Sequence, residues 1–204
     1  MKKIIPLLLI ALLLALLAAC SSPEPPPPPH EFAGAELSAP HPVPDGELIS
    51  TSGPVRLSDF RGKYVYVYFG YTFCPDICPM TLSTLQLMRS QLGEDSPIDP
   101  EQIQVVMVTV DPARDTADVM NTYMGYFDAS FVGLTGEQSQ IDAVGDPFGL
   151  YYKKGEGSVD TGYLMDHTSR FYLIDPEGNA RVAYPHDTDD ELLLADLTYL
   201  WENN

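Results

Sequence analysis

The sequence predicts an α/β domain in which a central mixed sheet is flanked by helices. Two observations lead to this fold class. The apolar run 64–69 is followed by a segment with helical periodicity and then by a second apolar run, 102–110. Strand, helix and strand in this order are typical of a parallel crossover. Near the end of the chain, two further apolar runs flank the turn sequence DPEGN, which indicates an antiparallel hairpin.

The first 44 residues are predicted to lie outside this domain. Residues 1–19 combine two lysines, an apolar stretch and two final alanines, which is typical of a secretory signal. The sequence Leu17-Ala18-Ala19-Cys20 resembles a bacterial lipobox, in which the cysteine is lipidated and becomes the mature N-terminus; an uncleaved membrane anchor is the alternative. Residues 20–44 contain the run PEPPPPP and are predicted to form a stiff tether, in or beside which His30 and His41 would be solvated. Both alternatives place the domain 45–204 in the cell envelope, on the extracytoplasmic side of a bacterial membrane.

The elements of the domain follow from periodicity and from turn residues. Aromatic and β-branched residues at 64–69 suit a buried strand. Asp115 or Thr116 can cap the second predicted helix, and Pro147 should interrupt the third. The predicted order is a hairpin extension (45–57), a strand (64–69), a helix after the cysteines, a strand (102–110), a helix to about 127, a short strand (131–134), a helix (137–152), a Gly-rich loop (153–162) expected to be mobile, two strands (169–174 and 180–184) and a helix (189–201). That order is typical of a thioredoxin-like fold.

The charge of the chain excludes one class of function. Acidic residues number 29 and basic residues 11, which gives a formal net charge of −18. Nucleic acid requires a basic surface, so no nucleic-acid partner is expected. An acidic surface of this kind can steer docking to a basic patch on a partner protein.

The strongest chemical signal is the pair Cys74 and Cys78, which follows the apolar strand and precedes Pro79 and a helical segment. At the start of a helix, free N–H groups and the helix dipole favour thiolate over thiol. A structural disulfide would close too short a loop to constrain the unfolded chain much. The pair therefore indicates either redox chemistry or metal binding.

A histidine adds to this pair. In a thioredoxin-like arrangement, the segment Asp166-His167-Thr168 enters a strand that faces the start of the cysteine helix. Two thiolates and one imidazole form a soft set that suits Cu(I), and that can hold Cu(II) if a further ligand joins. Zinc accepts the same ligands, but its structural sites use a fourth protein ligand for which the sequence has no obvious candidate.

Several acidic residues could support such a site. Asp166 is a candidate hydrogen-bond acceptor that would orient His167, and Asp76 lies between the two thiols, where it could tune their charge or contact a partner. Asp76 fits equally well as an acidic residue at a helix start. Asp111, Arg114 and Asp115 could support the site from a neighbouring strand end, or cap the helix that follows.

Three segments carry a resemblance to a known family. YFGYTFCPDICPMTLSTL, VTVDPARDT and YLMDHTSRFYLIDPEG resemble the signature segments of the SCO/SenC family. This resemblance implies a membrane-tethered, thioredoxin-like copper protein that helps to assemble the dinuclear copper centre of cytochrome c oxidase. It also implies that Cys74, Cys78 and His167 are the copper ligands. The copper-bearing oxidase subunit is the expected partner, with other copper chaperones or thiol reductants as further ones.

The function predicted from the sequence is that of a copper metallochaperone, which is most simply not an enzyme. The alternative is a thiol–disulfide oxidoreductase in which Cys74 and Cys78 reduce a partner's cysteines. The CxxxC spacing and a histidine in place of the usual proline count against that alternative. A peroxiredoxin-like peroxidase is disfavoured because Thr72 stands only two residues before Cys74.

Overall fold

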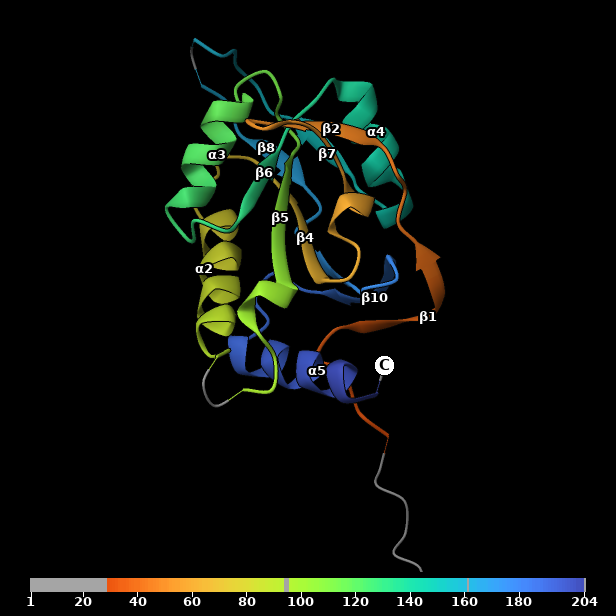
Figure 1. Cartoon of the computed structure of the whole chain (residues 1–204). Helices are drawn as coiled ribbons and strands as arrows, with labels where there is room; N and C mark the ends of the chain where they lie inside the picture. The colour runs from red at the N-terminus through yellow and green to blue at the C-terminus, as the bar shows by residue number, and fades with distance from the viewer. Residues whose placement is uncertain (1–28, 94–95, 161, 204) are drawn as a thin grey trace, which may run out of the picture. The chain divides into compact units, whose positions relative to one another are not determined.

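The computed structural model describes residues 29–93, 96–160 and 162–203, and its compact unit begins at Phe32. This unit holds the α/β domain shown in Figure 1. The signal segment, Cys20 and the first part of the expected tether, up to residue 28, lie outside the described residues, so the predictions made for them stay predictions. Among the helices that are described, none is both long enough and apolar enough to span a membrane.

A six-stranded mixed sheet forms the centre of the domain. Its order is β1-β10-β9-β4-β5-β6, with β4 parallel to β5 and antiparallel to β9, and β5 parallel to β6. The strands are β1 (Ala35–Pro42), β4 (Tyr64–Gly70), β5 (Ile103–Thr109), β6 (Val132–Leu134), β9 (Phe171–Ile174) and β10 (Asn179–Tyr184). The parallel crossover followed by an antiparallel hairpin confirms the predicted thioredoxin-like fold.

Strand β4 is central because it is apolar on both faces. All seven of its residues are buried, as are all seven of β5, which pairs with it from Tyr64 opposite Ile103 to Gly70 opposite Thr109. Strands covered on both faces read as continuous apolar runs, which is why these two were evident in the sequence. The carboxyl end of β4 leads directly into the cysteine loop.

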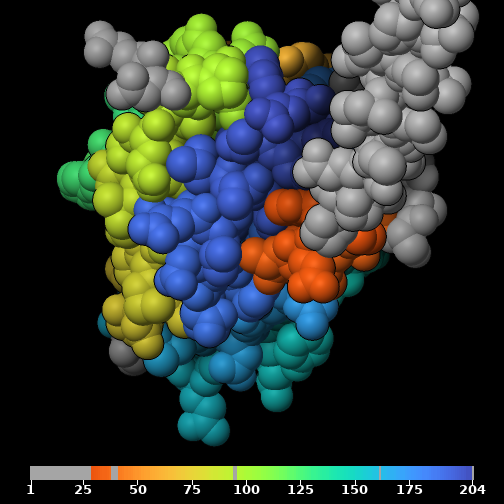
Figure 2. Space-filling model, turned by 90° about the horizontal axis from the view of Figure 1, so that it is seen from below, coloured from red at the N-terminus to blue at the C-terminus, as the bar shows by residue number. Residues whose placement is uncertain are grey.

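The helices are α2 (Ile77–Ser90), α3 (Ala117–Gly125), α4 (Gln138–Gly145) and α5 (Asp190–Asn203). Helices α2 and α5 contact each other, and Figure 2 shows α5, in blue, beside α2, in yellow. Hydroxyl groups on one face of β4 reach α5, since Tyr64 donates to the Leu200 carbonyl at 3.0 Å. On the other face, Phe69 packs on Phe148 of the short helix η3 (Asp146–Phe148), with ring centroids 5.4 Å apart.

Four short strands and two 3₁₀ helices complete the described domain. Strands β2 (Glu47–Ser50) and β3 (Gly53–Arg56) form the predicted N-terminal hairpin extension, and β7 (Tyr152–Lys154) pairs with β8 (Met165–His167). The Thr116 side chain caps α3 by accepting a hydrogen bond from the Val119 N–H at 3.3 Å, as predicted. The 3₁₀ helices η1 (Leu57–Phe60) and η2 (Pro100–Gln102) precede β4 and β5.

Two predicted boundaries differ from the structure. Strand β1 lies within the range 20–44 predicted as tether, and it pairs with β10 from Ala35 opposite Ala183 to Pro42 opposite Asn179. The folded sheet therefore begins at Ala35 and not at residue 45, and His41 belongs to a strand. The helix predicted for 137–152 ends at Gly145, because η3 and the left-handed Gly149 turn the chain into β7. Proline and a left-handed glycine are common helix terminators.

The early start of the sheet generates a stability prediction. Removal of residues 1–31 should leave the domain intact, whereas removal of residues 1–44 deletes β1 and the packing of Phe32, Leu37 and Val43 on the core. We expect the longer deletion to cost at least about 2 kcal/mol of unfolding free energy, which lowers Tm by about 4–8 °C. Thermal unfolding of both truncations measures this. Equal melting temperatures would mean that β1 adds nothing to the fold.

Candidate metal centre

The two cysteines follow the same strand, but their thiols lie in different environments. Gly70 ends β4, the loop 71–76 follows, and α2 starts at Ile77, so Cys74 lies in the loop and Cys78 in the first turn of the helix. Cys78 is fully buried, at 0% exposure, while Cys74 is half-buried, and both are free thiols. One sulfur is therefore held in the core and the other is open to an incoming molecule.

His167 lies beside the two cysteines, although it comes from a distant part of the sequence. It ends β8, and its Nε2 lies 3.7 Å from the Cys78 sulfur. Its Nδ1 lies 2.9 Å from the Thr168 carbonyl oxygen, which can only accept, so Nδ1 carries the proton. The Nε2 lone pair is then free to face the sulfurs, as a metal-binding imidazole requires.

The three side chains form a compact ligand set. One sulfur of each cysteine and one nitrogen of His167 all lie within 4.8 Å of one another, and no other His, Cys, Asp or Glu of the described residues joins them. A set of two sulfurs and one nitrogen without a fourth protein ligand suits Cu(I) better than structural zinc. The sequence prediction that these three residues converge is consistent with this geometry.

Two aromatic rings hold the imidazole in place. The Tyr71 ring meets His167 edge-on, at 5.7 Å between centroids and 88° between planes, and the Tyr68 ring does so at 6.2 Å and 66°. Edge-to-face contacts of this kind favour one ring orientation. Neither tyrosine was singled out from the sequence, because Tyr68 read only as part of an apolar strand and Tyr71 only as part of the segment that follows it.

The electrostatics of the two thiols differ strongly. The hydrogen bond from the Cys78 thiol is the largest cause that lowers the pKa of Cys74 far below its ordinary value, and the backbone N–H groups of Asp76 and Cys78 act in the same direction. For Cys78, the neighbouring Cys74 sulfur and burial raise the pKa instead. The half-buried sulfur of Cys74 therefore ionises more readily, and the buried sulfur of Cys78 holds its proton more tightly until a metal ion displaces it.

A buried carboxylate fixes the start of the cysteine loop. Asp115 is fully buried and accepts hydrogen bonds from the Thr72 N–H at 3.0 Å, the Thr72 hydroxyl at 2.5 Å and the Thr109 hydroxyl at 2.6 Å. Burial raises the pKa of Asp115, although these bonds oppose the shift. The residue therefore ties the loop to the end of β5, which goes beyond helix capping.

Arg114 joins the cysteine loop to the segment ahead of His167. Its guanidinium pairs with Asp111, donates to the Tyr163 carbonyl at 2.9 Å, and lies over the Tyr163 and Phe73 rings at 3.6 and 4.6 Å from their centroids. Tyr163 in turn donates its hydroxyl proton to Asp111 at 2.6 Å. These contacts position the two ligand-bearing segments against each other.

The two acidic residues predicted to support the site are Asp166 and Asp76. The group that accepts from His167 is the Thr168 carbonyl, and Asp166 is exposed on β8, so the orienting role expected for Asp166 is filled by backbone. Asp76 is exposed at the N-cap of α2 and makes no side-chain capping bond there. Its backbone N–H donates a hydrogen bond that lowers the pKa of Cys74. Sequence reasoning could not find Thr168, since a backbone acceptor has no residue signature.

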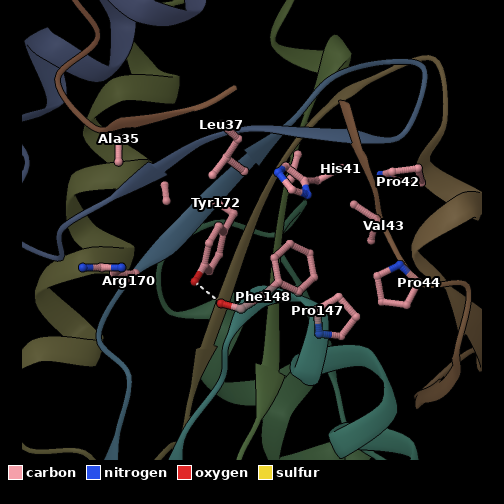
Figure 3. Close-up of a pocket in the computed structure, with 12 residues that line it drawn as sticks. Ala35, Leu37, His41, Pro42, Val43, Pro44, Pro147, Phe148, Arg170 and Tyr172 are labelled. Carbon is pink, nitrogen blue, oxygen red and sulfur yellow. Dashed lines mark hydrogen bonds between the residues drawn. The ribbon is translucent and has the colours of Figure 1, made fainter. Parts of the chain in front are cut away.

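A separate cavity of about 250 Å³ lies beneath β1, away from the thiols (Figure 3). Its walls are mainly apolar and include Leu37, Pro147 and Phe148, with Arg170 and His41 also lining it. The Tyr172 hydroxyl donates to the Phe148 carbonyl at 2.5 Å and closes one side. None of the three candidate ligands lines this cavity, so it is separate from the candidate metal centre.

Fold and site together define a thioredoxin-like protein in which two thiols and an imidazole form a metal-binding set. The family model described as SCO1/SenC matches residues 36–202. The chain therefore belongs to the SCO1/SenC family, as its three signature segments predicted.

Named relatives agree with this assignment. The chain is 40% identical over 135 residues to the Bos taurus protein "SCO2 homolog, mitochondrial", covering 66% of this chain and 50% of that protein. Among solved structures, apo Sco1 from Thermus thermophilus has a TM-score of 0.76 at 37% identity, over 85% of this chain and 99% of the other. Arabidopsis thaliana ScoI with copper bound has a TM-score of 0.71 at 31% identity, over 84% and 99%. The alignment spans about half the length of the bovine relative.

The difference between the thiols predicts selective alkylation. Because the pKa of Cys74 is lowered and that of Cys78 is raised, iodoacetamide should modify Cys74 at pH 5.5, where an ordinary thiol is almost entirely protonated. Mass spectrometry of the reduced protein should find one label, on Cys74, and Cys74→Ser should abolish it. Equal labelling of both cysteines, or none until pH 8, would contradict the proposed asymmetry.

The hydrogen bonds of Asp115 predict a stability effect. Asp115→Ala leaves the N–H and hydroxyl of Thr72 and the hydroxyl of Thr109 without their acceptor. Since each unsatisfied buried group costs about 1–3 kcal/mol, we expect a loss of about 3 kcal/mol or more in urea unfolding. Asp118→Ala, at an exposed position in the same region, is the control and should cost under about 1 kcal/mol.

Proposed function

We propose that this chain is a membrane-tethered copper metallochaperone that binds one copper ion through Cys74, Cys78 and His167. The observation that carries the proposal is the convergence of two sulfurs and one imidazole nitrogen within 4.8 Å, with no fourth protein ligand among the described residues. A solved relative with copper bound, from Arabidopsis thaliana, supports copper as the metal. Membership of the SCO1/SenC family supports delivery to the dinuclear copper centre of cytochrome c oxidase.

The asymmetry of the thiols suits transfer of copper as cargo. Cys78 is buried and held by the core, so it is the fixed ligand, while Cys74 is half-buried and can exchange with a ligand of the recipient. A site with three protein ligands leaves room for a fourth from outside, which allows ligands to be exchanged one at a time. Both thiols must be reduced, because a disulfide cannot bind the metal; copper loading is therefore coupled to redox state.

Two hollows border the cysteine loop and suit a docked recipient. One is mainly apolar and includes the exposed Phe73, Val119 and Tyr126, which are 57%, 37% and 78% exposed. The other lies along α2 and includes Asp76 and Asp189. A recipient segment with apolar and basic side chains would complement both, in line with the net charge of −18.

Attachment to a membrane belongs to the same proposal. A lipid on Cys20 would hold the domain on the extracytoplasmic side of a bacterial membrane, with residues between 20 and the start of β1 as the tether. A membrane-embedded oxidase would then be within reach. Labelling with a radioactive fatty acid, lost in Cys20→Ser, tests this attachment.

A second function is favoured by the thiolate character of Cys74. As a thiol–disulfide oxidoreductase, the Cys74 thiolate would attack a partner disulfide, form a mixed disulfide and release one partner thiolate. Cys78 would then lose its proton and attack the Cys74 sulfur, releasing the second partner thiolate and leaving a Cys74–Cys78 disulfide. The partner is reduced by two electrons and this protein is oxidised by two. Such a step would prepare the cysteines of the oxidase site for copper.

Copper binding to the reduced protein tests the main proposal. We expect one copper per chain in the wild type and a thiolate-to-Cu(II) absorption band. His167→Ala and Cys78→Ser should each weaken binding at least about 100-fold, because each removes one of three ligands. His41→Ala, in β1, is the matched control and should bind like the wild type.

Two results would overturn the copper assignment: no tight binding by the wild type, or wild-type binding by His167→Ala. Reduction of a cysteine-pair peptide disulfide by the copper-free protein then decides whether the oxidoreductase function stands. That activity should survive in His41→Ala and be lost in Cys74→Ser.

A further inference from the structure

Three tyrosines on one face of β4 each direct a hydroxyl toward a helix. Tyr64, Tyr66 and Tyr68 alternate along the strand, and all three are buried. The first two donate to main-chain carbonyls of α5, Tyr64 to Leu200 at 3.0 Å and Tyr66 to Leu193 at 3.5 Å. Tyr68 differs, because its hydroxyl donates to the sulfur of Cys78 at 3.3 Å. The strand that delivers the cysteines thus also supplies a hydrogen bond to one of them.

Close packing holds this pair together. A Cβ at Gly70 would lie 2.7 Å from Cε1 of Tyr68, 3.0 Å from the Cys78 sulfur and 3.0 Å from the Met107 methyl group. Tyr68 and Cys78 are each 0% exposed. The sulfur therefore meets the hydroxyl in a dry, filled part of the core, where a hydrogen bond is stronger than in water.

The direction of the hydrogen bond is fixed. The Tyr68 hydroxyl lies 3.3 Å from the Cys78 sulfur and points its hydrogen bond at it. A protonated phenol beside a sulfur is the donor and the sulfur is the acceptor. The bond strengthens as the sulfur gains negative charge, as it does on losing its own proton to bind a metal.

We propose that Tyr68 is a positioning residue that sets the donor strength of the Cys78 sulfur through this hydrogen bond. The inference rests on the proposed copper site but concerns a residue outside the ligand set. A hydrogen bond to a thiolate withdraws electron density from the sulfur, which weakens its donation to Cu(II) and favours Cu(I). It also stabilises the reduced pair relative to the disulfide, whose sulfurs are poorer acceptors.

The simpler explanation is that Tyr68 only fills space and finds a partner for its hydroxyl, as Tyr66 does. The two residues provide a matched comparison, since both are fully buried on the same face of the same strand. Tyr68→Phe and Tyr66→Phe each remove one hydroxyl and keep the ring, so their effects on stability should be similar. Only Tyr68→Phe removes a hydrogen bond to sulfur.

The first measurement needs no metal. The protein disulfide is equilibrated with glutathione, in which two glutathione thiols are oxidised to glutathione disulfide as Cys74 and Cys78 gain two electrons and two protons. We expect the equilibrium constant for reduction to fall about tenfold in Tyr68→Phe, a shift of about 30 mV for this two-electron couple. In Tyr66→Phe it should change less than about twofold.

The second measurement uses the copper-bound protein. In Tyr68→Phe, the thiolate-to-Cu(II) band should move to longer wavelength, because the sulfur donor orbital rises in energy without the hydrogen bond. Tyr66→Phe should keep the wild-type band. Wild-type values of both readouts in Tyr68→Phe, or equal shifts in the two variants, would overturn the proposal. If the wild type binds no copper, the copper function fails while the glutathione equilibrium alone decides the role of Tyr68.

Discussion

The close approach of the Cys78 sulfur to the end of β4 is the constraint on which the rest of the site depends. Gly70 makes it possible, because a side chain there would collide with both the sulfur and Tyr68. Once Cys78 is fixed against the strand, the helix that begins beside it must pack on the same face of the sheet, and the loop before it must carry Cys74 outward. The position of one sulfur thus determines where the other can lie.

The remaining contacts fix the cysteine loop and the segment that carries His167 relative to each other. Asp115 ties the loop to β5 through Thr72 and Thr109. Arg114 and its ion pair with Asp111 tie the same loop to the segment ahead of β8. The imidazole is oriented by a backbone carbonyl and two aromatic rings. Rigid support of this kind lets a three-ligand site keep its geometry while one ligand is exchanged.

Much of this architecture was predictable from the sequence because its signals are local. Continuous apolar runs identified β4 and β5, and the cysteine spacing and the later histidine identified the candidate ligands. The start of the sheet at Ala35 was missed, since the proline-rich composition around β1 hid a strand whose partner, β10, lies far along the chain. The hydrogen bonds to Thr168 and from Tyr68 were missed for a related reason. The acceptor at Thr168 is a backbone carbonyl. The hydrogen bond from Tyr68 joins a strand to a helix residue ten positions away.

The two outer strands of the sheet bear on how copies of the domain behave when close together. Strand β6 has three residues, and β1 contains a register shift between Glu36 and His41 and ends at Pro42. Short or irregular edges with proline offer a poor template for a further strand. Many copies crowded onto one surface would therefore have little tendency to extend one another's sheets, and each cysteine pair would stay accessible to visiting partners.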